Sequence, residues 1–204
     1  MSIEVWITFV AASMVLLIMP GPTILTVISY SIAHGYKAKT PLILAVALGD
    51  SVALAVSLLG LGVLLSESVF WFEALKWVGG LYLILLGIRL FRAANNAPSI
   101  SNPDLSASSW AIFLNTFLVT ALNPKGIIFF VAFLPQFITH NADAGLQLWV
   151  LAITFVILAT LNASMYAVFS GRAKQMLTSA KTQKRFNVCG AVLLCSAGAL
   201  SLVV

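Results

Sequence analysis

Two charged residues lie inside long apolar stretches of this 204-residue chain. Asp50 follows Ala47-Leu48-Gly49 near the middle of one stretch, and Lys125 lies near the middle of another. A charge at the centre of a bilayer is costly, so it normally faces a cavity or a partner. We therefore expect both side chains to face the protein interior. They form either a structural ion pair that only fixes helix packing, or a site where Asp50 takes up and releases a proton.

The second alternative predicts a coupling of protons to a solute. Burial and the nearby ammonium group of Lys125 act on the charge of Asp50 in opposite senses. A substrate that binds between the two side chains would shift this balance. The pair therefore favours a site where proton entry is linked to substrate exit.

Proline interrupts an apolar stretch at two places, Pro20-Gly21-Pro22 and Asn123-Pro124-Lys125-Gly126. Proline has no N–H and clashes with the preceding turn, so a helix breaks or kinks there. A new half-helix can begin with Pro22 or Pro124 at its first position, and its N–H groups and positive dipole end then face the break. That end suits a carboxylate, and the free carbonyl groups opposite suit an ammonium group or a cation. The alternative is a simple kink, which membrane helices tolerate.

The composition indicates a membrane protein. Apolar residues make up 61% of the chain and charged residues 8%, whereas a soluble domain carries roughly 25% charged residues. This excludes a soluble domain, a disordered chain and a disulfide scaffold. A helical crossing needs about 20 mostly apolar residues. Six spans meet this condition: Ile3–Ala33, Pro41–Leu65, Phe70–Phe91, Trp110–Phe137, Leu146–Phe169 and Phe186–Val204.

The two interrupted spans are the first and the fourth, so each opens one three-helix half of the chain. Because three is odd, the second half enters the membrane in the opposite orientation. Matched interruptions in two halves indicate an inverted-repeat transporter with its site at the repeat interface. The sequence thus predicts an all-α membrane protein with a single transmembrane domain over residues 1–204. It comprises repeat one (1–92), a polar cytoplasmic loop (93–109) and repeat two (110–204).

Basic residues set the predicted orientation. The side of the membrane with more Lys and Arg in its loops is cytoplasmic, which places both termini outside. The net charge of +5 then reflects topology and anionic lipid, and no nucleic-acid partner is expected. All but two of the 11 basic residues lie on this side: Lys37, Lys39, Arg89, Arg92, Arg172, Lys174, Lys181, Lys184 and Arg185.

Other kinds of site find little support. His34 and His140 lie at opposite faces under this topology, so no metal site is expected. No phosphate-binding Gly-Lys-Ser loop appears and no Ser-His-Asp group can be assembled at one depth, so neither a cofactor nor an enzymatic activity is predicted. Cys189 and Cys195 share the last span, which disfavours a membrane thiol-disulfide carrier. A passive channel and a non-transporting scaffold stay open.

Small and polar residues within the spans indicate how the helices pack. Pro41, Ala45 and Gly49 recur every four residues, a spacing that allows helices to approach closely. Asn115, Gln147 and Asn162 are expected to hydrogen-bond between helices rather than to contact a ligand. Asn123 differs from them because it lies at an interruption.

Several motifs together resemble the lysine exporter (LysE/RhtB) family of bacterial amino-acid exporters, over nearly the full length. Each motif is weak alone, but the set is specific. The motifs are Met19-Pro20-Gly21-Pro22, Ala47-Leu48-Gly49-Asp50, Leu75-Lys76-Trp77-Val78-Gly79-Gly80-Leu81-Tyr82-Leu83, Leu86-Gly87, Leu122-Asn123-Pro124-Lys125 and Phe133-Leu134-Pro135-Gln136-Phe137.

The resemblance implies a six-helix protein of the bacterial inner membrane that exports small amino acids, driven by the proton gradient. The expected partners are an amino-acid substrate, protons and the lipid bilayer. A slim bundle of 204 residues also favours a small homo-oligomer. The resemblance points to one site region, which comprises Pro20, Gly21, Pro22, Asp50, Asn123, Pro124 and Lys125.

Overall fold

In the computed structural model, the described part of the chain forms helices joined by turns and loops, without a strand. The structure describes residues 1–67, 77, 80–82, 84–85, 87–89, 91–92, 103, 105–138, 143–173 and 179–203. The predicted third span, Phe70–Phe91, and the predicted polar loop at 93–109 therefore lie largely outside the described residues. His140 lies outside them as well.

The first apolar stretch forms two helices. Helix α1 spans Ile3–Ile18 and α2 spans Pro22–His34. Between them lie residues 19–21, the first link, in which Met19 and Gly21 have extended backbone. Pro22 occupies the first position of α2, where its missing N–H costs nothing.

The stretch predicted as the fourth span is divided into four elements: α5 (Ser109–Ala121), α6 (Pro124–Ile128), the π-helix η3 (Phe129–Phe133) and the 3-10 helix η4 (Leu134–Phe137). Residues 122–123, the second link, separate α5 from α6, which again begins with a proline. The π-helix gives way to the 3-10 helix at Leu134, directly before Pro135. Proline has no N–H to donate to a regular α-helical turn.

The other elements whose bounds the structure describes are the 3-10 helix η1 (Gly35–Ala38), α3 (Lys39–Glu67), α7 (Ala144–Val168) and α9 (Ala180–Val203). Helix α9 begins before the predicted start of the last span at Phe186. The polar residues of its first turns include Lys181, Lys184 and Arg185, which are good helix formers. Apolar character indicates which part of a helix lies in lipid, but it does not indicate where the helix begins.

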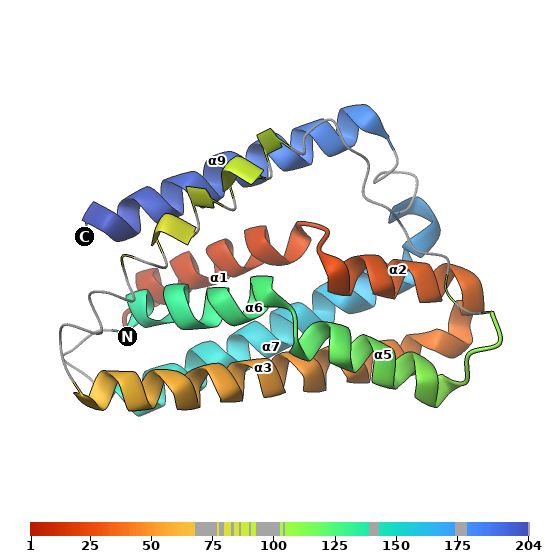
Figure 1. Ribbon diagram of the computed structural model, residues 1–204, viewed down its shortest axis with the longest axis horizontal. Coiled ribbons are helices and arrows are strands. Elements are labelled where there is room, and N and C mark those ends of the chain that lie inside the picture. Colours follow the sequence, from red (N-terminus) through yellow and green to blue (C-terminus); the bar gives the residue numbers. More distant parts are fainter. Residues whose placement is uncertain are drawn as a thin grey trace.

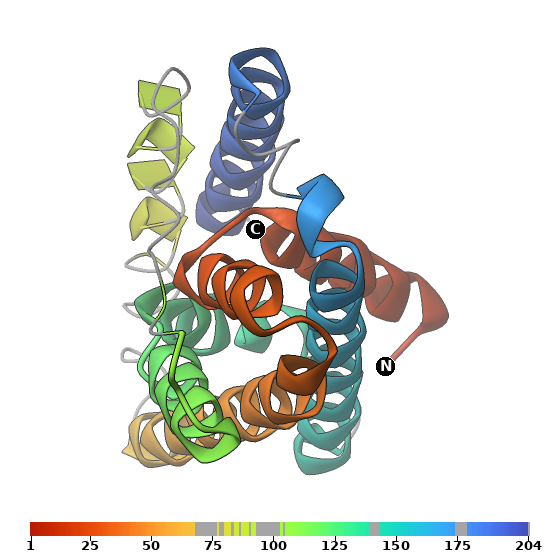
Figure 2. The ribbon, with the colours of Figure 1, turned by 90° about the vertical axis from the view of Figure 1, so that its right-hand side faces the viewer.

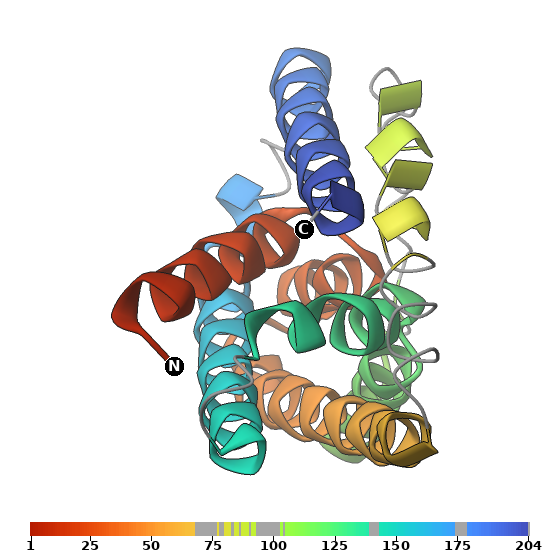
Figure 3. The same ribbon diagram turned by 90° about the vertical axis from the view of Figure 1, so that its left-hand side faces the viewer.

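The long helices run side by side along one axis (Figure 1). Helices α1 and α2 follow one another along this axis, and α3 runs back in the opposite direction. Viewed along the axis, α2 lies among α3, α5 and α7 (Figure 2), and it packs against all three. From the other end, the short α6 has the corresponding central place next to α3 (Figure 3). The N- and C-termini lie at the same end of the molecule (Figure 1).

Apolar side chains cover the outside of this bundle and polar side chains are buried inside it. Such a distribution suits lipid, where apolar surface needs no cover and helix interfaces favour small and polar residues. The exposed row on α3 consists of Leu44, Leu48, Val52, Val56 and Leu59. The buried polar side chains include Ser13, Thr23, Ser29, Ser31, Thr116, Thr120, Gln147 and Asn162.

Three of the described helical segments are long and apolar enough to cross a bilayer, judged by length and composition: Pro22–Leu59, Ser109–Phe137 and Ala144–Val168. The first of these segments begins directly after the first link, and the second contains the second link. The predicted arrangement of six spans in two inverted repeats stays a prediction.

The close helix approach predicted at Gly49 is confirmed. A Cβ atom at Gly49 would lie 2.7 Å from the Cβ atom of Thr120 and 3.1 Å from the carbonyl oxygen of Phe117. Helix α3 therefore packs on α5 without room for a side chain at this position. This contact fixes α3 one residue before Asp50, close to the end of α5.

Candidate functional site

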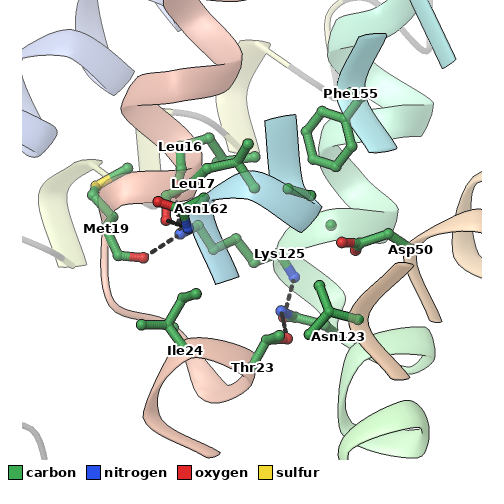
Figure 4. Close-up of a pocket in the computed structure, with 14 residues that line it drawn as sticks. Leu16, Leu17, Met19, Thr23, Ile24, Asp50, Asn123, Lys125, Phe155 and Asn162 are labelled. Carbon is green, nitrogen blue, oxygen red and sulfur yellow. Dashed lines mark hydrogen bonds between the residues drawn. The ribbon is translucent and has the colours of Figure 1, made fainter. Parts of the chain in front are cut away.

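A cavity of about 50 Å³ lies between α1, α2, α3, α6 and α7. A volume of roughly 10–15 Å³ holds one water molecule, so the cavity has room for a few waters or a small polar group. Asp50 from α3 and Lys125 from α6 both line it (Figure 4). The other lining residues are Leu16, Leu17, Met19, Gly21, Thr23, Ile24, Val46, Asn123, Gly126, Phe155, Ala159 and Asn162.

The last turn of α1 needs hydrogen-bond donors from elsewhere in the protein. In an α-helix, each carbonyl oxygen accepts a hydrogen bond from the N–H group four residues further on. For Leu16 and Ile18 those positions are Pro20 and Pro22, which have no N–H. We call the carbonyl oxygens of Leu16, Leu17, Ile18 and Met19 the α1 carbonyl end.

Lys125 donates to two of these four oxygens. Its Nζ atom lies 2.5 Å from the carbonyl oxygen of Leu16 and 2.9 Å from that of Met19. The carbonyl end of a helix carries a partial negative charge, so an ammonium group is a favourable partner there. In Figure 4 the Lys125 side chain extends from α6 towards Met19 and the end of α1.

Helix α7 supplies the other two donors. The Nδ2 atom of Asn162 donates to the carbonyl oxygen of Leu17 at 3.0 Å, and the hydroxyl of Tyr166 donates to that of Ile18 at 2.9 Å. The two side chains are four residues apart and so lie on one face of α7. Every oxygen of the α1 carbonyl end therefore accepts a hydrogen bond from a side chain of α6 or α7.

Asn123 joins the two links. Its Oδ1 atom accepts a hydrogen bond of 3.1 Å from the backbone N–H of Lys125, which caps α6. Its Nδ2 atom donates to Oγ1 of Thr23, in the first turn of α2, also at 3.1 Å. Asn123 therefore holds the beginning of α6 and the beginning of α2 together beside the cavity.

Asp50 faces the same cavity without such partners. Within the described parts of the chain, its carboxylate makes no hydrogen bond and no ion pair within 4.0 Å. The Asp50 and Lys125 charges still interact electrostatically across the cavity. The close ion pair considered from the sequence is thus not formed, because the Lys125 ammonium group is directed to the α1 carbonyl end.

The structure brings most of the predicted site residues together. Asp50, Asn123, Lys125 and Gly21 line the cavity. The three prolines are not among the lining residues. Pro20 lies in the first link, and Pro22 and Pro124 are the first residues of α2 and α6.

Three further polar residues were not among the predicted site residues, namely Thr23, Asn162 and Tyr166. Asn162 was expected to hydrogen-bond between helices, and it does so with α1. The sequence contains a pattern that points to the two residues of α7. Asn162 and Tyr166 are polar residues at helical spacing within an apolar span.

The described residues contain no group of three or more His, Cys, Asp or Glu side chains that could hold a metal ion. Cys189 and Cys195 are free thiols, and both lie on α9. A pair of thiols on separate helices, which a thiol-disulfide carrier needs, is therefore not provided by these two residues.

Comparisons with known proteins agree with the resemblance drawn from the motifs. The homoserine/homoserine lactone efflux protein of Salmonella typhi is 31% identical over 200 residues, which cover 98% of this chain and 97% of the relative. The leucine efflux protein of Klebsiella pneumoniae subsp. pneumoniae is 26% identical over 167 residues, covering 81% and 78%. An uncharacterized membrane protein of Vibrio cholerae is 28% identical over 188 residues, covering 92% and 91%.

No solved structure matches the chain. Residues 14–203, nearly the whole chain, match the family described as LysE type translocator. This match, and the similarity to efflux proteins over most of their length, confirm the predicted family. The chain belongs to the LysE type translocator family, and it is accordingly a transporter and not an enzyme.

Proposed function

We propose that this protein is a secondary transporter that exports amino acids or close derivatives from the bacterial cytoplasm by proton antiport. One observation carries the proposal. Residues of both proline-flanked links, Gly21 and Asn123, line a single cavity together with Asp50 and Lys125. Discontinuous helices whose ends face a common site are typical of secondary transporters.

The chemistry of the cavity supports an amino acid as the substrate. Asp50 and the α1 carbonyl end are acceptors for an ammonium group, and the Lys125 ammonium group is a partner for a carboxylate. Leu17, Ile24 and Phe155 supply apolar wall for a side chain. The names of the relatives, a homoserine/homoserine lactone efflux protein and a leucine efflux protein, support export of this class of compound.

The proposed architecture has six spans in one transmembrane domain, with two inverted repeats whose first helices are broken by proline. Three observations support it. The links at 19–21 and 122–123 fall in the first stretch of each half. The two termini lie at the same end of the molecule (Figure 1), as an even number of crossings requires. The basic loops favour the opposite end as the cytoplasmic one, with both termini outside the inner membrane.

The proposed proton site is Asp50. Its carboxylate has no hydrogen-bond partner within the described residues and it shares the cavity with the proposed substrate site. A partly buried carboxyl group that lies within an apolar segment long enough to cross a bilayer, and that is not committed to a structural bond, is suited to bind and release a proton during a transport cycle. Protonation of Asp50 from outside and substrate release to the outside would then be linked events.

The test uses purified protein in proteoliposomes loaded with labelled homoserine. For the wild type, an imposed pH gradient is expected to drive homoserine movement against its concentration gradient. Asp50→Asn is expected to abolish this gradient-driven movement while it preserves exchange of labelled for unlabelled homoserine. Asp143→Asn is the matched control, because Asp143 is exposed and its Oδ1 cap of α7 can be replaced by an amide oxygen.

Three outcomes separate this proposal from its rivals. Full gradient-driven transport by Asp50→Asn would refute the proton role of Asp50. Flux in the wild type that ignores the pH gradient would favour a passive channel. Absence of any flux, for homoserine, leucine and related amino acids alike, would favour a non-transporting scaffold.

A further inference from the structure

We infer that the carbonyl oxygens of Leu16 and Met19 form a binding site for a primary ammonium group, for which Lys125 and the substrate compete. The two oxygens bind the Lys125 ammonium group in this structure, at 2.5 and 2.9 Å. The natural competitor is the ammonium group of the exported amino acid, and this part of the inference rests on the proposed function.

The four oxygens of the α1 carbonyl end are held in two different ways. Leu17 and Ile18 accept from Asn162 and Tyr166, which are short or rigid side chains on the long helix α7. The other two oxygens accept from a lysine, whose ammonium group is carried on a flexible four-carbon chain. These two are therefore the oxygens that can exchange their donor while α1 keeps its place against α7.

The same two oxygens belong to residues that line the cavity, Leu16 and Met19, and the Lys125 side chain that donates to them lines it as well. Prolines at positions 20 and 22 and the extended first link keep backbone donors away from this helix end. An ammonium group that enters the cavity thus meets acceptors whose only described donor is the Lys125 side chain.

Lys125 has a second partner available when it is displaced. Asp50 lines the same cavity, and its carboxylate makes no hydrogen bond within the described residues. A lysine side chain that turns from the α1 carbonyl end to Asp50 stays paired. Because an unpaired charge in the bilayer is costly, this second partner makes the exchange of one ammonium group for another energetically feasible.

The geometry also defines which cations fit. A primary ammonium group has hydrogens to donate to both oxygens and a positive charge that suits the helix end. A quaternary ammonium ion keeps the charge but has no hydrogen to donate. A hydroxyl group in place of the ammonium group can donate one hydrogen bond but lacks the charge. The site should therefore select primary ammonium groups over both.

The experiment measures thermal unfolding of the purified protein in detergent. Lys125→Ala removes the internal ammonium group, and its Tm is expected to lie below that of the wild type. Propylammonium chloride at tens of millimolar is expected to raise the Tm of Lys125→Ala by a few degrees, because a ligand that binds only the folded state stabilises it. Tetramethylammonium chloride at the same concentration is expected to leave that Tm unchanged.

Lys37→Ala is the matched control, because Lys37 is an exposed lysine outside the cavity. Neither this variant nor the wild type should respond to propylammonium as Lys125→Ala does. Equal shifts in all three proteins, equal shifts with the two cations, or no shift in Lys125→Ala would overturn the inference. Rescue limited to Lys125→Ala and to the primary ammonium ion supports it.

A second measurement keeps the inference testable if Lys125→Ala does not fold. Homoserine is expected to raise the Tm of the wild type, whereas 2,4-dihydroxybutyrate, its analogue with a hydroxyl for the ammonium group, is not. Equal stabilisation by both compounds, or none by homoserine, would overturn the ammonium site. The two proposals also fail separately: propylammonium rescue without amino-acid transport refutes the proposed function alone, and transport without rescue refutes the ammonium site alone.

Discussion

The ammonium nitrogen of Lys125 lies 2.9 Å from the carbonyl oxygen of Met19, although the two residues are 106 positions apart in the chain. A helix end without donors is costly inside a bilayer, because lipid chains offer no hydrogen-bond partner to the carbonyl groups. Helix α1 ends at Ile18, and the prolines at positions 20 and 22 have no N–H to offer to its last carbonyl groups. Donors from the second half, Lys125 on α6 and two side chains on α7, stabilise it. The Lys125 ammonium group thus stabilises the end of α1.

Replacing both prolines, in the double variant Pro20→Ala/Pro22→Ala, should close the first link. The new N–H groups can donate to the carbonyl oxygens of Leu16 and Ile18, which lets α1 and α2 join into one helix. We expect a Tm within a few degrees of the wild type, because Lys125 can then pair with Asp50, and we expect the loss of homoserine transport. Hydrogen exchange at residues 20–22, followed by mass spectrometry, should become slower.

Pro41→Ala is the control for this experiment. Pro41 lies in the first turn of α3, where proline is tolerated and where no interrupted helix end depends on it. This variant should transport at close to the wild-type rate. Wild-type transport by a double variant whose exchange data show a continuous helix would contradict the role given to the first link.

Tyr166→Phe should destabilise the protein and slow transport at the same time. The change removes only the hydroxyl that donates to the carbonyl oxygen of Ile18. The bond between α7 and α1 is then lost, at a cost of about 1 kcal/mol in the free energy of unfolding. Equilibrium unfolding in denaturant and transport in proteoliposomes measure the two effects. Tyr36→Phe, at a site where the side chain is 83% exposed, should change neither.

The two charged residues of the candidate site could be predicted from the sequence, because charged residues are rare within long apolar stretches. A charge within an apolar stretch must find a cavity or a partner, and this holds for Asp50 and Lys125, which line one cavity. Helices α2 and α6 each begin with a proline of these stretches. The expected close approach at Gly49 followed from residue size and spacing alone.

The partner of Lys125 could not be predicted in this way. Its acceptors are backbone carbonyl groups, which every residue has, so nothing in the side-chain sequence marks Leu16 and Met19. The roles of Asn162 and Tyr166 depend on where α7 crosses the end of α1, which is a property of the tertiary structure. The π-helix at Phe129–Phe133 was not expected either, because the apolar residues there fit any helical winding.

Asn123 and Thr23 should show an energetic coupling across the two links. Their side chains form a hydrogen bond of 3.1 Å that joins the beginning of α6 to the beginning of α2. A double-mutant cycle of Asn123→Ala and Thr23→Val, measured as unfolding free energy, should give a coupling of about 0.5–1.5 kcal/mol. Asn123→Ala should also cost about 1 kcal/mol on its own, because Asn123 caps α6.

A cycle of Asn123→Ala with Tyr30→Phe provides the reference. Tyr30 forms its hydrogen bond with Asn115, so it shares no partner with Asn123. The effects of these two changes should add within about 0.5 kcal/mol. If both cycles were additive, the contact between Asn123 and Thr23 would not hold the two links together.

Gly126→Ala should separate stability from transport. Of the described atoms outside its own turn of the backbone, a Cβ atom at this position would find only Cε2 of Phe130 within 4 Å, at 3.9 Å, so it fits without a clash. An alanine within a helix is more favourable than a glycine by about 0.5–1 kcal/mol, which predicts an unchanged or higher Tm. Because Gly126 lines the cavity next to Lys125, the added methyl group takes space from the substrate. Transport of homoserine should therefore fall by roughly tenfold or more.

Gly171→Ala tests whether the loss of transport comes from the cavity. Among the residues that the structure describes, a Cβ atom at Gly171 would meet nothing within 4 Å, and this exposed residue is not part of the cavity lining. The change should leave transport at the wild-type level while it affects the Tm in the same direction as Gly126→Ala. If Gly126→Ala transported homoserine normally, the substrate would have to pass through the protein elsewhere than beside Lys125, and the cavity between the two links would lose its proposed role.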